Sequence, residues 1–232
     1  VHLGTGNYHA RTARLYTDYG LLTCDEALGR DAARVFQLLT SLGQVKALSK
    51  MLQSPFTLHK KVIEKIKREA ANARAGKAAR IIVKCNALIE PETIEALYQA
   101  SQDGVRIDCI IRGVCCLRPG VPGVSDNIHV RSIVGRFLEH TRVFYFHNEG
   151  DFDLYLSSAD WMGRNFFQRV ETAFPVADRK IRQRILKDGL ELYLADNTDA
   201  WVLQKDGEYK RRVPVGKQRP HSAQSSLMSR KP

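Results

Sequence analysis

Residues 79–113 show a regular change between apolar and polar segments. The run ARIIVKCNAL at 79–88 is almost continuously apolar, which is typical of a buried strand. EPETIEALYQASQDG at 90–104 has helical spacing, with a proline near its start and a glycine at its end. VRIDCIIRG at 105–113 alternates between apolar and polar residues and predicts a second strand. A strand, a helix and a strand in this order predict a βαβ unit with parallel strands and a right-handed crossover.

The same periodicities predict further elements on both sides of this unit. An apolar stripe on a basic segment predicts a helix over residues 57–75, and Gly76 ends it. The stripe consists of Val62, Ile63, Ile66, Ala70 and Ala73. We also expect a strand over 14–23, a helix over 25–42, a strand within 152–165 and a closing helix over about 178–194. The fold class predicted from these elements is α/β.

The chain divides at the segment GQVKALSKMLQSPF, residues 43–56, whose composition is typical of a connector. We expect residues 1–50 to be the C-terminal part of a first unit that is truncated at its N-terminus. Residues 51–209 then form a complete second unit. Residues 210–232 are basic and rich in small polar side chains, which predicts a disordered tail.

Charge narrows the classes of partner. The chain has 36 Lys and Arg against 25 Asp and Glu, a formal net charge of +11 at pH 7, which favours a polyanionic binding partner.

Other features of the sequence bear on where the protein works. No run approaches the roughly 18 apolar residues of a membrane span. The five cysteines lack metal-ligand spacing and are expected to be reduced. Neither a signal peptide nor an initiator Met begins the chain, so we expect a piece of a longer cytoplasmic protein, with peripheral membrane association as an alternative.

Candidate phosphate contacts lie at the ends of the predicted strands, where α/β sheets bind their ligands. Lys84 and Asn86 end the first strand of the βαβ unit, and Arg112 ends the second. Because arginine can bind phosphate oxygens through two N–H groups, these positions favour an anionic ligand.

Two other segments have a common pattern of small residues, then Asn or Asp, then a basic residue. The first is HLGTGNYHARTAR, which contains His2, Asn7 and Arg14. The second is LSSADWMGRN, which contains Arg164 and follows a strand that opens at His140. Small residues allow backbone N–H groups to approach an anion closely. The repeated pattern predicts an internal duplication whose first copy is incomplete.

This duplication resembles the phospholipase D fold, in which two similar halves each give a histidine to one phosphoryl-transfer site. That fold implies an α/β architecture with a mixed sheet flanked by helices. The usual signature of the superfamily is His-x-Lys with an Asp further on. Here His140 is followed by Arg142, and no Asp stands at the expected spacing, so an ordinary phosphodiesterase or nuclease is disfavoured.

A longer resemblance covers the chain up to about residue 215. The strings HLGTGNYHARTARLYTDYGLLT, LIEPETIEALYQASQDGVRIDCIIRGVCCLRPG, GVSDNIHVRSIVGRFLEHTRVFYF and DLYLSSADWMGRNFFQRVETAFPV together resemble the C-terminal region of bacterial polyphosphate kinases. The resemblance implies reversible transfer of the terminal phosphate of ATP to polyphosphate through a phosphohistidine. It makes residues 1–50 the end of a first phospholipase D-like catalytic domain and residues 51–209 a second one.

The resemblance also assigns roles to residues of this chain. Tyr16 is expected to contact the nucleotide, Arg112 the ATP phosphates, and His140 to be the second histidine of the site. The phosphorylated histidine and the arginines associated with magnesium are expected upstream of Val1, so the isolated chain is expected to be inactive and to hold no metal site. His2, Asn7, Arg14, Lys84, Asn86 and Arg164 stay candidates for phosphate contacts.

The partners that follow are ATP or ADP, inorganic polyphosphate and Mg²⁺ bound with ATP, in a protein expected to form homo-oligomers when full length. Two alternatives stay open. One is a phospholipase D-like phosphodiesterase or nuclease, and the other is a non-catalytic module that binds a polyanion. The sequence contains no recognised nucleic-acid motif, so a specific nucleic-acid partner is not expected.

Overall fold

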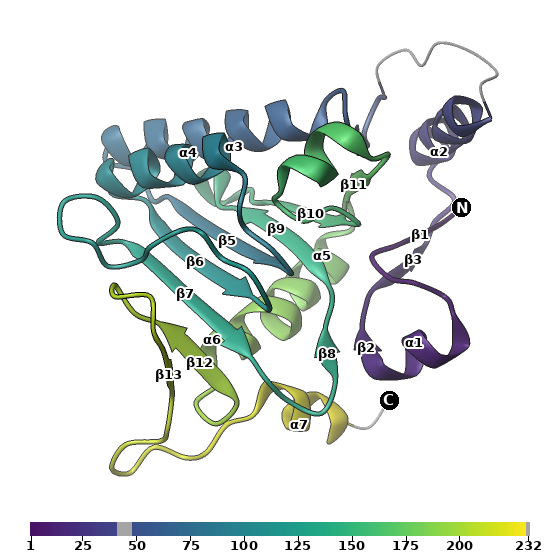
Figure 1. Ribbon diagram of the computed structural model, residues 1–232. Coiled ribbons are helices and arrows are strands. Elements are labelled where there is room, and N and C mark those ends of the chain that lie inside the picture. Colours follow the sequence, from purple (N-terminus) through teal and green to yellow (C-terminus); the bar gives the residue numbers. More distant parts are fainter. Residues whose placement is uncertain (41–47, 231–232) are drawn as a thin grey trace.

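A mixed β-sheet organises the chain in the computed structural model, which describes residues 1–40 and 48–230. Within these residues the sheet has nine strands in the order β13-β12-β7-β6-β5-β9-β10-β11-β4 (Figure 1). The strands are β4 (Leu52–Gln53), β5 (Arg80–Cys85), β6 (Arg106–Ile111), β7 (Ile128–Ile133), β9 (Arg142–Phe146), β10 (Asp153–Ser157), β11 (Thr172–Pro175), β12 (Ala200–Leu203) and β13 (Tyr209–Arg211). The predicted α/β class, with a mixed sheet flanked by helices, is confirmed.

The predicted βαβ unit is present at the centre of this sheet. β5 and β6 are parallel and in register from Arg80 opposite Arg106 to Cys85 opposite Ile111, and β7 continues the parallel part. The intervening helix α4 (Pro91–Gln102) begins at the N-cap residue Glu90, whose carboxylate accepts hydrogen bonds from backbone N–H groups of the first turn. The remaining neighbours in the sheet are antiparallel.

Helices cover both faces of the sheet because its strands are apolar on both faces. On β5, Ile81 and Val83 pack against α4 and α3 (Leu58–Arg74), whereas Ile82 faces the opposite layer. That layer consists of α5 (Arg179–Ile185), the π-helical segment η3 (Leu186–Glu191) and α6 (Leu192–Ala195), which run on continuously (Figure 1). The helices predicted over 57–75 and 178–194 are therefore both present.

The first unit lies next to β8, beyond the ends of the central strands of this sheet (Figure 1). It consists of β1 (His2–Gly4), α1 (Ala10–Leu15), β2 (Tyr16–Thr17), β3 (Gly20–Leu22) and α2 (Glu26–Leu39). The continuous strand predicted over 14–23 is wrong, because Arg14 and Leu15 end α1 and the chain breaks again at residues 18–19. The break arises because β3 pairs with β1, whereas β2 pairs with a distant segment.

Two further predictions need correction. The connector at 43–56 contains β4, which pairs with the edge strand β11; residues 41–47, including the end of the predicted helix over 25–42, lie outside the described residues. The disorder predicted for 210–232 is wrong for 210–230, since β13 extends the sheet and Ala223–Met228 forms helix α7. Ala223 and Gln224 are buried there, while the basic side chains that suggested disorder face solvent.

The cysteines are free in the structure, with Cys85 and Cys109 buried in the core and Cys24 and Cys116 exposed. Burial raises the pKa of the Cys85 and Cys109 thiols well above the ordinary value, which makes both poor nucleophiles. None of the helices in the described ranges has the length and apolar composition needed to cross a membrane.

The carboxylate of Asp31 joins α2 to the segment that leads into β4. It is fully buried and accepts hydrogen bonds from the backbone N–H groups of Ser49, Lys50 and Met51, at 2.8, 2.7 and 3.0 Å. Burial alone would raise the pKa of this carboxyl, but the three N–H donors outweigh burial and hold the pKa below its usual value.

We predict that Asp31→Asn lowers the free energy of unfolding by about 1–3 kcal/mol, because a neutral amide is a weaker acceptor for three buried N–H groups. The carboxylate contribution is present above the unfolded-state pKa of about 4 and is lost as pH falls through the lower folded value. Urea unfolding between pH 3 and pH 7 therefore converges for wild type and variant at the acidic end. Glu26→Gln, at an exposed position of the same helix, is the matched control. An equal difference at every pH contradicts this account.

Candidate functional site

A short parallel strand pair brings the two units together. β2 pairs with β8 (Leu138–Glu139), with Tyr16 opposite Leu138 and Thr17 opposite Glu139. The backbone N–H of His140 then donates a hydrogen bond to Thr17 Oγ1, at 3.2 Å. As a result the rings of Tyr16 and His140 lie 5.0 Å apart between centroids. Two of the residues assigned by resemblance thus lie side by side.

Asp18 orients the imidazole of His140. Its Oδ2 is 2.9 Å from His140 Nδ1, and its Oδ1 accepts a hydrogen bond from Thr5 Oγ1 at 2.7 Å. Thr5 Oγ1 in turn accepts from the backbone N–H of Tyr19, at 3.0 Å, so the position of the carboxylate is fixed by the first unit. This arrangement assigns the Nδ1–H tautomer to a neutral His140, with Nδ1 as donor to Asp18.

Arg142 lies against the other side of this imidazole. Its Nη1 is 3.1 Å from His140 Nε2 and 3.4 Å from Nδ1. Nε and Nη2 donate to the two carboxylate oxygens of Asp160, at 3.1 and 3.3 Å. Asp160 also accepts from the backbone N–H of Asn86, at 2.8 Å. No Asp stands at the expected spacing, and Asp160, 18 residues beyond Arg142, provides the two-oxygen contact that a planar guanidinium requires.

Glu139 and Lys84 form a buried ion pair directly behind His140. Lys84 Nζ lies 2.8 Å from Glu139 Oε2. The Lys84 side chain is 3% exposed and the Glu139 side chain 4% exposed. Lys84 Nζ also lies 3.4 Å from the centre of the Tyr193 ring. Burial lowers the pKa of the Lys84 ammonium, and the adjacent Glu139 carboxylate opposes this shift. Lys84 thus holds β8 through Glu139 and also lines the larger of two cavities, so its phosphate contact stays a prediction.

Arg112 reaches the same strand from the end of β6. Its Nη1 donates to the backbone carbonyl of Glu139 at 3.0 Å, and its side chain is half-buried. Arg112 thus contacts the residue that precedes His140, and its role as a phosphate contact stays a prediction. The other N–H groups of this guanidinium have no protein acceptor within the described residues.

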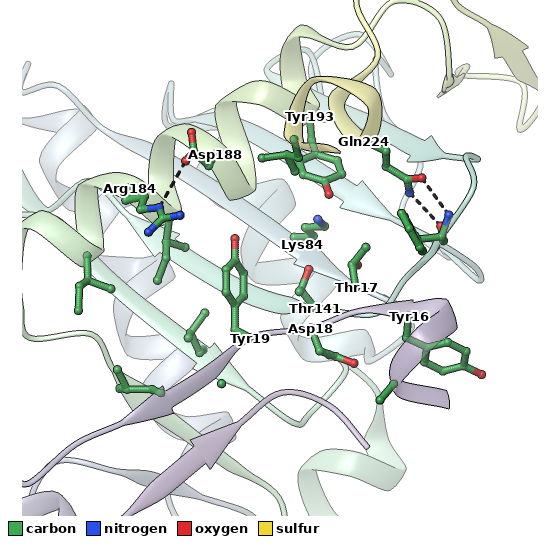
Figure 2. Close-up of a pocket in the computed structure, with 18 of the residues that line it drawn as sticks. Tyr16, Thr17, Asp18, Tyr19, Lys84, Thr141, Arg184, Asp188, Tyr193 and Gln224 are labelled. Carbon is green, nitrogen blue, oxygen red and sulfur yellow. Dashed lines mark hydrogen bonds and ion pairs between the residues drawn. The ribbon is translucent and has the colours of Figure 1, made fainter. Parts of the chain in front are cut away.

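Two cavities share wall residues of the β2 segment, and Figure 2 shows the larger of them. The larger has a volume of about 730 Å³, and Tyr19, Lys84, Thr141 and Tyr193 lie around it. The smaller has a volume of about 210 Å³. Tyr16, Asp18 and Tyr19 belong to the walls of both. Among the described residues Thr141 Oγ1 has no hydrogen-bond partner although it is buried, so the wall of the larger cavity contains an unsatisfied hydroxyl.

The remaining predicted phosphate contacts are distributed unevenly. Arg14 lines the larger cavity, whereas His2 and Asn7 line the smaller one. The His2 ring is hydrogen-bonded to the hydroxyl of Tyr8. Asn86 lines neither cavity and belongs to the Asp160 network. Arg164 is exposed at the start of η2 (Arg164–Gln168), and within residues 1–40 and 48–230 it has no ion pair, so it is not brought to this site.

Sequence reasoning missed several residues of the site, namely Asp18, Glu139, Asp160, Tyr193 and Gln224. Asp18 carries a local signal, because it follows Tyr16 by two residues in RLYTDY and a carboxylate near a functional histidine suggests an orienting role. Asp160 stands in LSSADWMGRN, at the strand end where ligands were expected. Tyr193 and Gln224 carry no such signal, because their contacts depend only on the tertiary fold.

We predict that Lys84→Met alone lowers the free energy of unfolding by about 3–5 kcal/mol, because it leaves the Glu139 carboxylate buried without its counter-charge. Lys84→Met combined with Glu139→Gln should recover most of this loss, since no buried charge then stays unpaired. Equilibrium unfolding of the two single variants and the double variant forms a double-mutant cycle. Additive losses in the cycle would contradict the pairing.

Comparisons with known proteins agree with this geometry. The family model described as polyphosphate kinase C-terminal domain 2 matches residues 51–224, and that of C-terminal domain 1 matches residues 1–45. Polyphosphate kinase from Burkholderia multivorans is 61% identical over 212 residues, which is 91% of this chain and 31% of that protein. The polyphosphate kinase of Pseudomonas aeruginosa is 58% identical over 230 residues, 99% of this chain and 33% of that protein.

A solved structure of polyphosphate kinase from Porphyromonas gingivalis superposes with a TM-score of 0.93 at 36% sequence identity. The match covers 97% of this chain and 34% of that one. The chain thus spans about a third of the length of the relatives it matches. Because the domain 2 model alone covers well over half of its residues, this chain belongs to the polyphosphate kinase family and corresponds to the C-terminal region of its members.

Proposed function

We propose that the protein containing this region is an ATP-dependent polyphosphate kinase, which transfers the terminal phosphate of ATP reversibly to inorganic polyphosphate through a phosphohistidine. Family membership supports this proposal. The observation that carries it is the β2–β8 pairing, which sets Tyr16 beside His140 and gives that histidine a carboxylate partner, Asp18. An oriented histidine beside an aromatic ring and several arginines suits the transfer of a phosphate from a nucleotide.

In this proposal His140 acts as the imidazolium, in which Nδ1–H donates to Asp18 and Nε2–H either transfers its proton to the leaving oxygen or hydrogen-bonds a phosphate oxygen. The phosphate oxygen then replaces the contact of Nε2 with Arg142. Arg142 is fixed against the same ring by Asp160 and contributes positive charge where the phosphate oxygens become more negative. The free N–H groups of Arg112 bind ATP phosphates, and the ring of Tyr16 contacts the base.

The phosphorylated histidine, in our proposal, lies in the part of the full-length protein that precedes residue 1, and the region described here supplies the second half of the site. Mg²⁺ enters as part of the substrate, bound to the ATP phosphates. Among residues 1–40 and 48–230 no group of three or more His, Cys, Asp or Glu side chains is placed to hold a metal ion. The net charge of +11 is suited to a polyanionic product.

We predict that the full-length protein, incubated with Mg²⁺ and γ-labelled ATP, forms labelled polymer and a protein phosphate that is acid-labile and alkali-stable. His140→Ala should lower the rate of polymer synthesis by about 10²–10⁴-fold, because it removes the proton donor. Asp18→Asn should cause a smaller loss, because the ring stays but its orienting carboxylate is weakened.

His129→Ala is the matched control, since His129 is exposed on β7 and should leave the rate unchanged. The 232-residue chain alone should acquire no label. Wild-type rates in His140→Ala would contradict the assigned role. Absence of label from the wild-type full-length protein would instead favour a phosphodiesterase or a polyanion-binding module.

A further inference from the structure

Helix α7 contacts the candidate site through Gln224. The side-chain Oε1 accepts a hydrogen bond from the backbone N–H of Phe137 at 2.9 Å, and Nε2 donates to the carbonyl of the same residue at 2.8 Å (Figure 2). Nε2 also donates to Glu139 Oε1, at 2.6 Å. Gln224 is 3% exposed, so these hydrogen bonds form away from water. Their geometry fixes the backbone that leads into β8.

The close approach of Gln224 depends on Gly135. A Cβ atom at that position would lie 2.6 Å from Gln224 Oε1 and 2.8 Å from its Cδ. Any larger residue would therefore displace the amide or the loop. The glycine permits the side chain of α7 to reach the backbone of the 135–137 segment directly.

The residue that Gln224 contacts, Glu139, joins three other residues of the site. Its Oε2 accepts from Thr17 Oγ1 at 3.0 Å and pairs with Lys84, while its backbone carbonyl accepts from Arg112. The next residue is His140. Tyr16 is held by the β2–β8 pairing, so Tyr16, Arg112 and His140 all take their positions from the two residues of β8.

We propose that Gln224 is a positioning residue of the nucleotide site, and that α7 fixes β8 so that Tyr16, Arg112 and His140 converge on ATP. This inference rests on the proposed function, and it assigns to the C-terminal helix a part in nucleotide binding. Gln224 acts through its hydrogen bonds to Phe137 and Glu139.

The location of α7 does not itself depend on the Gln224 amide. The backbone N–H of Ala223 donates to Asp196 Oδ2 at 2.7 Å, and both Ala223 and Asp196 are fully buried. Ser222 Oγ caps the helix by accepting from the N–H of Ser225, at 3.2 Å. Substitution of Gln224 should therefore release β8 while α7 stays in place, which separates a positioning role from a general loss of folding.

The test uses the full-length protein with Gln224→Ala, Gln224→Met and Gln224→Glu, and Ser229→Ala as the control at the exposed end of the same helix. Gln224→Met keeps the volume but loses every hydrogen bond of the amide. We expect Gln224→Ala and Gln224→Met to raise the KM for ATP and the Kd of a non-hydrolysable ATP analogue by about tenfold, the equivalent of one or two hydrogen bonds. The Kd for polyphosphate should stay close to wild type, and the unfolding midpoint should fall only by the loss of these buried hydrogen bonds.

Gln224→Glu gives a second, independent readout. It places a carboxylate against Glu139, in surroundings that also contain Lys84 and Tyr193. Two carboxylates at this distance are stable when they share one proton, so the activity of this variant relative to wild type should rise as pH falls from 8 to 6. Gln224→Met, which cannot share a proton, should show no such rise.

The outcomes distinguish this inference from the proposed function. If the wild type makes labelled polymer but Gln224→Ala and Gln224→Met bind the ATP analogue with unchanged Kd, the positioning role is overturned and the proposed function stands. If the Kd for ATP analogue and for polyphosphate weaken equally with a large fall in the unfolding midpoint, the residue is structural and the inference is also overturned. A wild type that makes no polymer removes the proposed function, and with it the basis of this inference.

Discussion

The buried carboxylate of Glu139 is the constraint on which the candidate site depends. A carboxylate removed from water must receive hydrogen bonds or a counter-charge, because an unpaired one would cost several kcal/mol. Thr17, Lys84 and Gln224 supply those partners, and they come from the first unit, the central sheet and the C-terminal helix. Satisfying one side chain therefore fixes three distant segments against one another. The arrangement of Tyr16, Arg112 and His140 follows from that requirement.

The βαβ unit at the centre of the fold could be predicted from sequence, because the residues that determine each of its elements lie within that element or next to it. The apolar run of β5 and the capped helix α4 carry their own signals, and the parallel pairing of β5 with β6 follows from the connection between them. β2 could not be predicted in this way. Its two residues pair with β8 more than a hundred positions away, and the local alternation of residues 14–23 contains no trace of that partner. The same reason explains the tail, where the buried residues Ala223 and Gln224 are flanked by serines and their partners are distant in sequence.

Resemblance to a family located Tyr16, Arg112 and His140, but not the groups that orient them. Asp18 and Asp160 determine how His140 and Arg142 are held, and neither was selected from the sequence. The change from lysine to arginine at position 142 has a structural counterpart in Asp160. A lysine makes a point contact with a carboxylate, whereas the flat guanidinium of Arg142 uses both oxygens of Asp160 and keeps one nitrogen against the imidazole. Lys84 shows what the position of a residue at a strand end does not predict. Its charge is paired with the buried carboxylate of Glu139, and the sequence gives no sign of that ion pair.

The partners of Glu139 also differ in when they leave the ribosome. Thr17 precedes Glu139 by 122 residues and Gln224 follows it by 85. Chains are synthesised from the N-terminus, and contacts between such distant residues form slowly because a long loop must close first. During translation the Glu139 carboxylate therefore lacks its hydrogen bond from Gln224 until α7 has been synthesised. The contact of Gln224 with Glu139 forms only after the central sheet has been synthesised, so the surroundings of β8 are completed late in the synthesis of this region.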